Sequence, residues 1–147
     1  LAIPVFHDEE NFHFEIGKGE VLREGSDVAL ISTGLMTAEA LAAADELAQA
    51  GIHARIINLC SIKPLDEELV LKAARECGRI VTCEEHSVIG GLGEAVCAVI
   101  AEAGVACRVK RVGVNDEFGH SGPAKEVLAQ FGLDAAGIVR AAKSLLG

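Results

Sequence analysis

The chain has 147 residues, half of them apolar, and a formal net charge of −9 at pH 7. This length is typical of one domain that buries about two-thirds of its unfolded surface. The acidic balance argues against nucleic acid and anionic membrane surfaces as partners, because both repel a negatively charged protein. No apolar run approaches the roughly 18 residues that a membrane span needs, and with no Trp or Tyr the core is expected to be aliphatic.

The cysteines are odd in number and contain no C-x-x-C pair: Cys60, Cys77, Cys83, Cys97 and Cys107. Because most lie in apolar runs, we expect buried free thiols and a reducing, cytoplasmic setting. Only Cys83 and His86 have ligand-like spacing, so we expect no metal site. The chain starts at Leu1 without a visible signal peptide, which suggests a cut or processed piece of a longer protein.

Residues 1–26 are irregular and are predicted to form a lead-in strand and linker. Phe12–Ile16 alternates apolar and polar residues, as a half-buried strand does. After the turn at Gly17–Gly19, Glu20–Leu22 is placed to pair back on it as a hairpin. The α/β domain is then expected to occupy residues 27–147.

From residue 27 onward, short apolar runs alternate with longer segments of helical spacing. The predicted strands are Asp27–Thr33, Ile52–Leu59, Ile80–Cys83 and Val105–Val112. The predicted helices are Thr37–Gln49, the segment between Asp66 and Gly78, the apolar run Ala95–Ala101 continuing toward Gly104, Pro123–Phe131, and a last helix capped by Asp134. This alternation predicts βαβ units and a parallel sheet.

Right-handed crossovers would place the loops that follow the four strands at one edge of the sheet. These loops are Thr33–Thr37, Asn58–Pro64, Glu84–Gly93 and Asn115–Gly122. Open parallel sheets meet ligands or partners at this edge. The alternative to a functional site is that these loops are polar only because surface loops are polar in any protein.

The glycine turn before the third predicted helix half-matches a dinucleotide-binding fingerprint, as Gly91-x-Gly93-x-x-Val96. It ends in Val, follows the third strand instead of the first, and has no acidic residue about twenty positions later. Close packing of a helix on a strand explains the turn as well.

Two polar clusters lie in the predicted edge loops. Glu84, Glu85 and His86 could form a general acid/base group, but adjacent residues point in different directions, which favours interface or hydrogen-bond roles. Asp116, Glu117, His120 and Ser121 are residue types found in hydrolases. Ser121 lacks the G-x-S-x-G elbow, however, and is better placed to cap the helix at Pro123. We therefore expect no catalytic residue in this chain.

Four segments taken together resemble the C-terminal domain of transketolase-like thiamine-diphosphate enzymes: IGKGEVLREGSDVALISTG, AxxLAxxGIxARIINLCSIKPLD, EEHSVIGGLGEAV and GVNDEFGHSG. The match runs from about Phe14 to Leu146 in the family's order. The element Asp116-x-Phe118-Gly119-x-Ser121-Gly122 is most similar to transketolases, including those split into two chains. Related 1-deoxyxylulose-5-phosphate synthases and 2-oxoacid dehydrogenase beta subunits usually differ in this loop.

The resemblance implies a three-layer α/β sandwich: a mostly parallel five-stranded sheet, one strand antiparallel, with helices on both faces. It also implies that the chain alone is inactive. In the family, thiamine diphosphate and a divalent metal such as Mg²⁺ lie between two other domains, one with a Gly-Asp-Gly…Asn motif and one supplying a glutamate. Neither motif can be placed in this sequence.

What remains would be the accessory domain that packs on the pyrimidine-binding domain and helps to form the dimer of a two-carbon ketol transferase acting on sugar phosphates. We expect its partner to be the cofactor-binding domains or subunit of the same enzyme, in a homo-oligomer. The expected contact residues are Glu85, His86, Asp116, Phe118, His120 and Ser121. Two alternatives stay open: the equivalent domain of a 2-oxoacid dehydrogenase beta subunit or a 1-deoxyxylulose-5-phosphate synthase, and a free-standing nucleotide- or anion-binding module using Gly90–Gly93.

Overall fold

The computed structural model of the chain describes residues 18–33, 36–59, 65–87, 91–114 and 134–146, with the backbone alone at 85–87 and 114. Its elements, in chain order, are β1 (Gly19–Arg23), β2 (Val28–Ser32), α1 (Met36–Gln49), β3 (Ala54–Leu59), α2 (Glu67–Cys77), β4 (Arg79–Ser87), α3 (Leu92–Ala103), β5 (Arg108–Val114) and α5 (Ala135–Leu146). None of the helices within these ranges has the length and apolarity to cross a bilayer.

The five strands form one sheet in the order β1-β3-β2-β4-β5. β2 pairs in parallel with both β3 and β4, and β4 pairs in parallel with β5. β1 pairs antiparallel with β3 at one edge. The predicted mostly parallel sheet with one antiparallel strand is therefore confirmed. The chain leaves β2 for β3 on one side and returns to β4 on the other, so the strand order reverses between β2 and β4.

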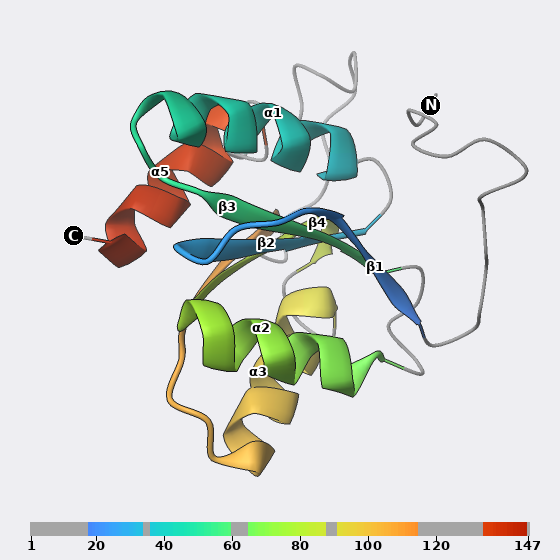
Figure 1. Ribbon diagram of the computed structural model, residues 1–147. Coiled ribbons are helices and arrows are strands. Elements are labelled where there is room, and N and C mark those ends of the chain that lie inside the picture. The colour runs from blue at the N-terminus through green and yellow to red at the C-terminus, as the bar shows by residue number, and fades with distance from the viewer. Residues whose placement is uncertain (1–17, 34–35, 60–64, 88–90, 115–133, 147) are drawn as a thin grey trace, which may run out of the picture.

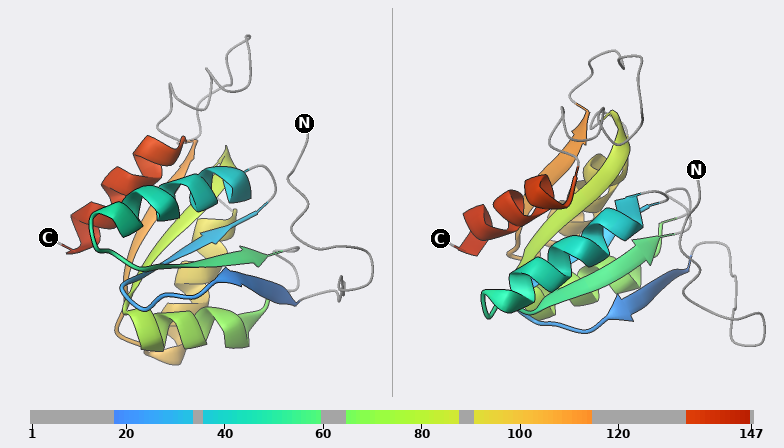
Figure 2. Two further views of the ribbon diagram at one scale, coloured as in Figure 1. Left: turned by 45° about the horizontal axis from the view of Figure 1, so that its top comes forward. Right: turned by 90° about the horizontal axis from the view of Figure 1, so that it is seen from above.

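Helices cover both faces of the sheet, as the three-layer expectation requires (Figures 1 and 2). α1 and α5 lie on one face, and α2 and α3 lie on the other. The central strand β2 is buried at every position, and its side chains alternate between two cores. Val28 and Leu30 join the core under α1 and α5, whereas Ala29 and Ile31 join the core over α2 and α3.

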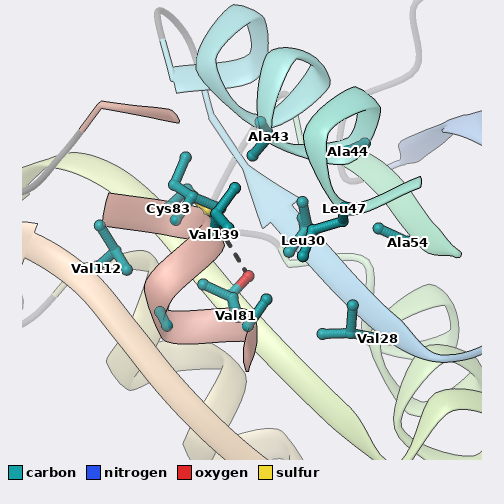
Figure 3. Close-up of a cluster of buried hydrophobic side chains, with 14 of the residues drawn as sticks. Val28, Leu30, Ala43, Ala44, Leu47, Ala54, Val81, Cys83, Val112 and Val139 are labelled. Carbon is teal, nitrogen blue, oxygen red and sulfur yellow. Dashed lines mark hydrogen bonds between the residues drawn. The ribbon is translucent and has the colours of Figure 1, made fainter. Parts of the chain in front are cut away.

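The core under α1 and α5 is built from aliphatic strand residues and helix alanines (Figure 3). Ala43 and Ala44 present small side chains to the sheet, so the helix backbone can approach Leu30 closely. Burying a side chain such as Leu30 contributes about 1.5–3 kcal/mol. The absence of Trp and Tyr from the sequence is consistent with this close aliphatic packing.

Four predicted helix caps are confirmed by the structure. Asp66 caps α2 by accepting the Leu69 N–H at 3.2 Å, and Asp134 accepts the Gly137 N–H at 3.1 Å at the start of α5. Gly78 and Gly104 end α2 and α3 in the left-handed region, with φ of 70° and 68°. Glycine adopts this conformation without the Cβ penalty of other residues.

The third strand is longer than predicted. β4 continues from Arg79 to Ser87, so Glu84–His86 lie within a strand instead of a loop. Cys83 pairs with Val112 and Ser87 pairs with Val114, which leaves the three residues Glu84–His86 opposite Gly113 alone. We call Glu84–His86 the β4 bulge. The sequence could not reveal it because the neighbouring β5, which keeps β4 extended, lies more than twenty residues further along the chain.

Two further boundaries differ from the predictions, and the fifth strand lies within the segment predicted as lead-in strand and linker. α3 begins at Leu92, before the apolar run starting at Ala95, and β5 begins at Arg108 instead of Val105. The fifth strand is Gly19–Arg23, which pairs with β3, so part of the predicted linker belongs to the sheet. The predicted strand Phe12–Ile16 and the predicted helix Pro123–Phe131 lie outside the described residues.

Candidate functional site

The parallel strands bring their carboxyl ends to one edge of the sheet, which we call the carboxyl edge. Ser32 at the end of β2 is in register with Asn58 of β3 on one side and with Cys83 of β4 on the other. Because the strand order reverses between β2 and β4, this is the position at which open α/β sheets commonly meet ligands or partners. The predicted convergence of polar loop residues is therefore confirmed for Asn58 and Glu84, and Ser32, at the end of its strand, lies at the same edge.

Glu84 is the central polar residue of this edge, and its side chain is only 1 % exposed. Its Oε1 accepts the Leu92 N–H and its Oε2 accepts the Gly93 N–H, each at 2.8 Å. These two amides belong to the first turn of α3, where backbone donors have no partner within the helix. A carboxylate at this end also interacts favourably with the helix dipole. Glu84 thus has a hydrogen-bonding role, which the sequence favoured over acid/base catalysis for this cluster.

The glycine turn serves close packing. A Cβ added at Gly93 would lie 2.7 Å from Arg111 Cδ and 2.8 Å from Thr82 Oγ1, distances that real Cβ atoms do not show. The buried Thr82 hydroxyl beneath it has no hydrogen-bond partner among the described residues. Because Glu84 already accepts the Leu92 and Gly93 amides, the start of α3 does not offer these two donors to a nucleotide phosphate. This finding argues against the anion-binding alternative.

A second polar group connects the start of α1 to two strands. Thr37 Oγ1 donates to Asn58 Oδ1 at 3.2 Å, which leaves Ser32 Oγ to donate to Thr37 Oγ1 at 3.0 Å. The predicted helix starts at Thr37, but α1 already begins at Met36. Thr37 instead lies in the first turn and ties the helix to the ends of β2 and β3.

Cys83, which has ligand-like spacing to His86 in the sequence, is fully buried. Its side chain joins the core under α1 and α5 and donates weakly to the Val81 carbonyl. Burial raises the pKa of the Cys83 thiol, and the Glu84 carboxylate raises it further, so the thiol stays protonated. Elsewhere in the described ranges, no three His, Cys, Asp or Glu side chains gather as a metal would require.

The residues that the structure describes at the carboxyl edge do not match those that hold the cofactor in the resembling family. The sequence contains no Gly-Asp-Gly motif, and the described carboxylates at the carboxyl edge, such as Glu84 and Asp66, are engaged with helix amides. These residues do not fit a metal-bound diphosphate, and no chemical step through that group follows from them.

The six predicted contact residues divide into two groups. Glu85 and His86 lie in the β4 bulge, at the carboxyl edge. The other four lie outside the described residues: Asp116, Phe118, His120 and Ser121. Their segment follows β5, which ends at Val114 on the carboxyl edge, and precedes α5, whose first N–H is bonded to Glu39 in the first turn of α1 at 3.0 Å.

The sequence did not predict that Glu84 binds the first amides of α3 or that Glu39 binds the first amide of α5. One signal was available for Glu84: the α3 N-cap is Gly91, which has no side chain to accept an amide. The free N–H groups at a helix start without a local side-chain cap need an acceptor from elsewhere, such as a carboxylate. No local pattern points to Glu39, since its partner is 96 residues away.

The fold and this edge define an open α/β domain of the doubly wound class, with an antiparallel edge strand and a polar switch point between β2 and β4. Residues 17–138 match the model of the transketolase C-terminal domain. The chain belongs to this family.

Several relatives carry names from split or single-chain enzymes. A 6-deoxy-6-sulfo-D-fructose transketolase subunit of a Clostridium species is 50 % identical over 92 % of this chain and 42 % of its own length. A putative transketolase C-terminal section of Methanocaldococcus jannaschii is 45 % identical over the same shares. A 1-deoxy-D-xylulose-5-phosphate synthase of Heliobacterium modesticaldum is 44 % identical over 98 % of this chain and 22 % of its own length.

Among solved structures, a split-gene transketolase described as an inactive beta4 tetramer superposes with a TM-score of 0.91 and 46 % identity. The superposition covers 98 % of this chain and 46 % of that one. This chain therefore spans less than half the length of these relatives.

Proposed function

We propose that this chain acts as the C-terminal accessory section of a transketolase, packing against the cofactor-binding part of the enzyme and supporting its dimer. The observation that carries the proposal is the extent of the alignment: 92 % of this chain aligns with 42 % of the length of proteins named as a transketolase C-terminal section or subunit. The remaining part of such a relative is long enough to hold a further domain.

The state of the carboxyl edge supports a docking role over a chemical one. Its buried polar side chains, Ser32, Thr37 and Glu84, are engaged with one another or with helix amides. A general base needs to reach a substrate proton, and Glu84, 1 % exposed and bonded through both oxygens, does not present itself to one. The chain alone would therefore be inactive.

In the assembled enzyme, thiamine diphosphate and a divalent metal such as Mg²⁺ would supply the chemistry that moves a two-carbon ketol unit between sugar phosphates. Both would be held by the partner domains or subunit. We further propose that Glu85, His86 and the 116–121 segment contact that partner, because the described residues flanking them converge on the carboxyl edge.

The test is reconstitution with the polypeptide encoded immediately upstream of this chain. We expect a stable complex by analytical ultracentrifugation and ketol transfer that requires both parts, thiamine diphosphate and Mg²⁺. Calorimetry with thiamine diphosphate should show no binding to the 147-residue chain alone. Turnover by this chain in isolation, or tight cofactor binding to it, would overturn the proposal.

Charge reversal at the edge separates contact residues from bystanders. Glu85→Lys should weaken the complex with the upstream polypeptide. The matched control is Glu102→Lys, which makes the same charge change in the last turn of α3, where the residue is exposed. If the two variants assemble equally well, Glu85 is not a contact residue.

The synthase relatives favour one second candidate. Their identity of 44 % over 98 % of this chain is close to that of the transketolase sections. The Asp116–Gly122 element argues for transketolase, and the products decide. Formation of 1-deoxyxylulose 5-phosphate by the reconstituted enzyme would identify the synthase, whereas transfer of a ketol unit between sugar phosphates would identify the transketolase.

A further inference from the structure

Glu84 joins two segments that meet at the carboxyl edge. It lies at the start of the β4 bulge, where the strand departs from regular pairing with β5. Its two oxygens bind the amides of Leu92 and Gly93, the first two residues of α3. The carboxylate therefore links the bulge directly to the first turn of α3.

We propose that Glu84 is a positioning residue that locks the β4 bulge to α3 and thereby fixes the docking rim that carries Glu85 and His86. The use of that rim for docking rests on the proposed function, but the lock itself does not. Bulges re-aim side chains at functional sites, and an irregular strand segment needs an anchor beyond its own ladder hydrogen bonds.

A local cap would have been the simpler way to satisfy α3. The N-cap Gly91 has φ of −99°, a value open to any residue, so Ser or Asp could stand there and accept an amide of the first turn. The chain instead buries a carboxylate, which is unfavourable unless its hydrogen bonds compensate fully. What Glu84 provides and a local cap does not is the link back to β4.

The experiment compares three variants of the 147-residue chain with the wild type: Glu84→Gln, Glu84→Gln with Gly91→Ser, and the exposed control Glu102→Gln. In Glu84→Gln the side-chain oxygen can still accept one backbone N–H, but the side-chain NH2 group faces the other N–H, and two donors cannot form a hydrogen bond. Gly91→Ser adds a local cap for α3 without restoring the link to the bulge. Amide hydrogen exchange is measured at residues 85–87 and at Leu92 and Gly93.

We expect Glu84→Gln to speed exchange at both segments by roughly tenfold or more, as the loss of a hydrogen bond to a charged group implies. Adding Gly91→Ser should slow exchange again at Gly93, whose amide an N-cap side chain can accept, but leave 85–87 fast. The control should match the wild type. If Glu84→Gln fails to fold, Glu84→Asp, which keeps the charge with a shorter reach, should show the same pattern to a smaller extent.

Binding to the upstream polypeptide is measured at a temperature where every variant is fully folded. Both Glu84 variants should bind roughly tenfold more weakly than wild type. Full rescue of exchange at 85–87 or of binding by Gly91→Ser would reduce Glu84 to a helix cap and overturn the lock. If the wild type itself does not bind, the proposed function fails, while the exchange data still decide whether the lock exists.

Discussion

Glu39 in α1 and Ala135 at the start of α5 are separated by 96 residues, yet Glu39 Oε1 accepts the Ala135 N–H at 3.0 Å. The bond connects the two helices that cover one face of the sheet. It also supplies a cap that α5 shares with its own Asp134, which bonds Gly137. The start of α5 is thus attached to the carboxyl edge by a side chain of α1.

Removing this bond should loosen the final helix. Glu39→Ala is expected to lower the free energy of unfolding by about 1.5–3 kcal/mol, the range for a hydrogen bond to a charged group. Urea denaturation gives the value. Glu46→Ala, at an exposed position of the same helix, should change the free energy by less than about 0.5 kcal/mol. Equal losses in both variants would show that the Ala135 bond contributes nothing.

Gly93→Ala tests whether the glycine turn exists for packing. Alanine gains about 1 kcal/mol in helix propensity over glycine, but its Cβ would overlap Thr82 Oγ1 and the Arg111 side chain. Overpacking costs about 1–3 kcal/mol, so we expect a net loss of stability.

Thr82→Ala should relieve part of the overlap that the Cβ of Gly93→Ala creates, because it removes Thr82 Oγ1. Because the Thr82 hydroxyl has no partner among the described residues, its removal should cost little by itself. The double variant Thr82→Ala with Gly93→Ala should recover part of the stability that Gly93→Ala loses. Additive losses in thermal unfolding would mean that the two positions do not clash.

The end of α2 depends on a left-handed residue at Gly78. Its φ is 70°, its N–H bonds the Ala74 carbonyl at 3.0 Å, and nothing lies within 4 Å of an added Cβ. Gly78→Ala should therefore cost about 1 kcal/mol through the backbone alone. Gly78→Asn should cost less, since asparagine tolerates this conformation better. Equal stability of Gly78→Ala and wild type in urea titrations would contradict this account.

The Cys83 thiol should make stability fall at alkaline pH. Burial, with a smaller effect of Glu84, raises its pKa in the folded chain above the ordinary value of 9.0. Above pH 9 the unfolded chain releases this proton and the folded chain keeps it, so the folded state binds more protons and the free energy of unfolding decreases with pH. The loss approaches about 1.4 kcal/mol per pH unit for one thiol.

The control for this effect is Cys83→Ala. The variant should be less stable at pH 7, because it loses a buried side chain, but its stability should decline less steeply between pH 8 and pH 10. Thiol-reactive dyes should label Cys83 only after unfolding. Identical pH slopes for wild type and variant would assign the decline to other groups.

The sequence predicted the parts of this fold whose ends are marked by local signals such as helix caps and turn glycines. β2, α1, β3 and α2 lie within about two residues of their predicted ranges, because short apolar runs and caps such as Asp66 and Gly78 mark their ends. The parallel sheet followed from their alternation. The resemblance to transketolases added the antiparallel strand, and the predicted lead-in strand within residues 1–26 completed the count of five. β1, Gly19–Arg23, is the segment that forms it.

What the sequence did not disclose depends on distant partners. Glu84 sits in a run of polar residues that is typical of a loop, yet pairing with β5 extends β4 through it and the start of α3 draws its side chain into the interior. The contact between Glu39 and Ala135 likewise joins segments that no local pattern relates. Glu85 and His86 remain predicted contacts, as do four residues of the segment that follows β5: Asp116, Phe118, His120 and Ser121.

Carboxylates at the starts of α2, α3 and α5 reduce the affinity that this domain would have for phosphate groups. Positive helix ends are natural traps for phosphate, but here Asp66, Glu84 and the pair Glu39 and Asp134 already neutralise them. The domain would consequently exert little pull on a diphosphate or a sugar phosphate held nearby. Such a neighbour can sit close to a reaction centre without competing for its charged reactants.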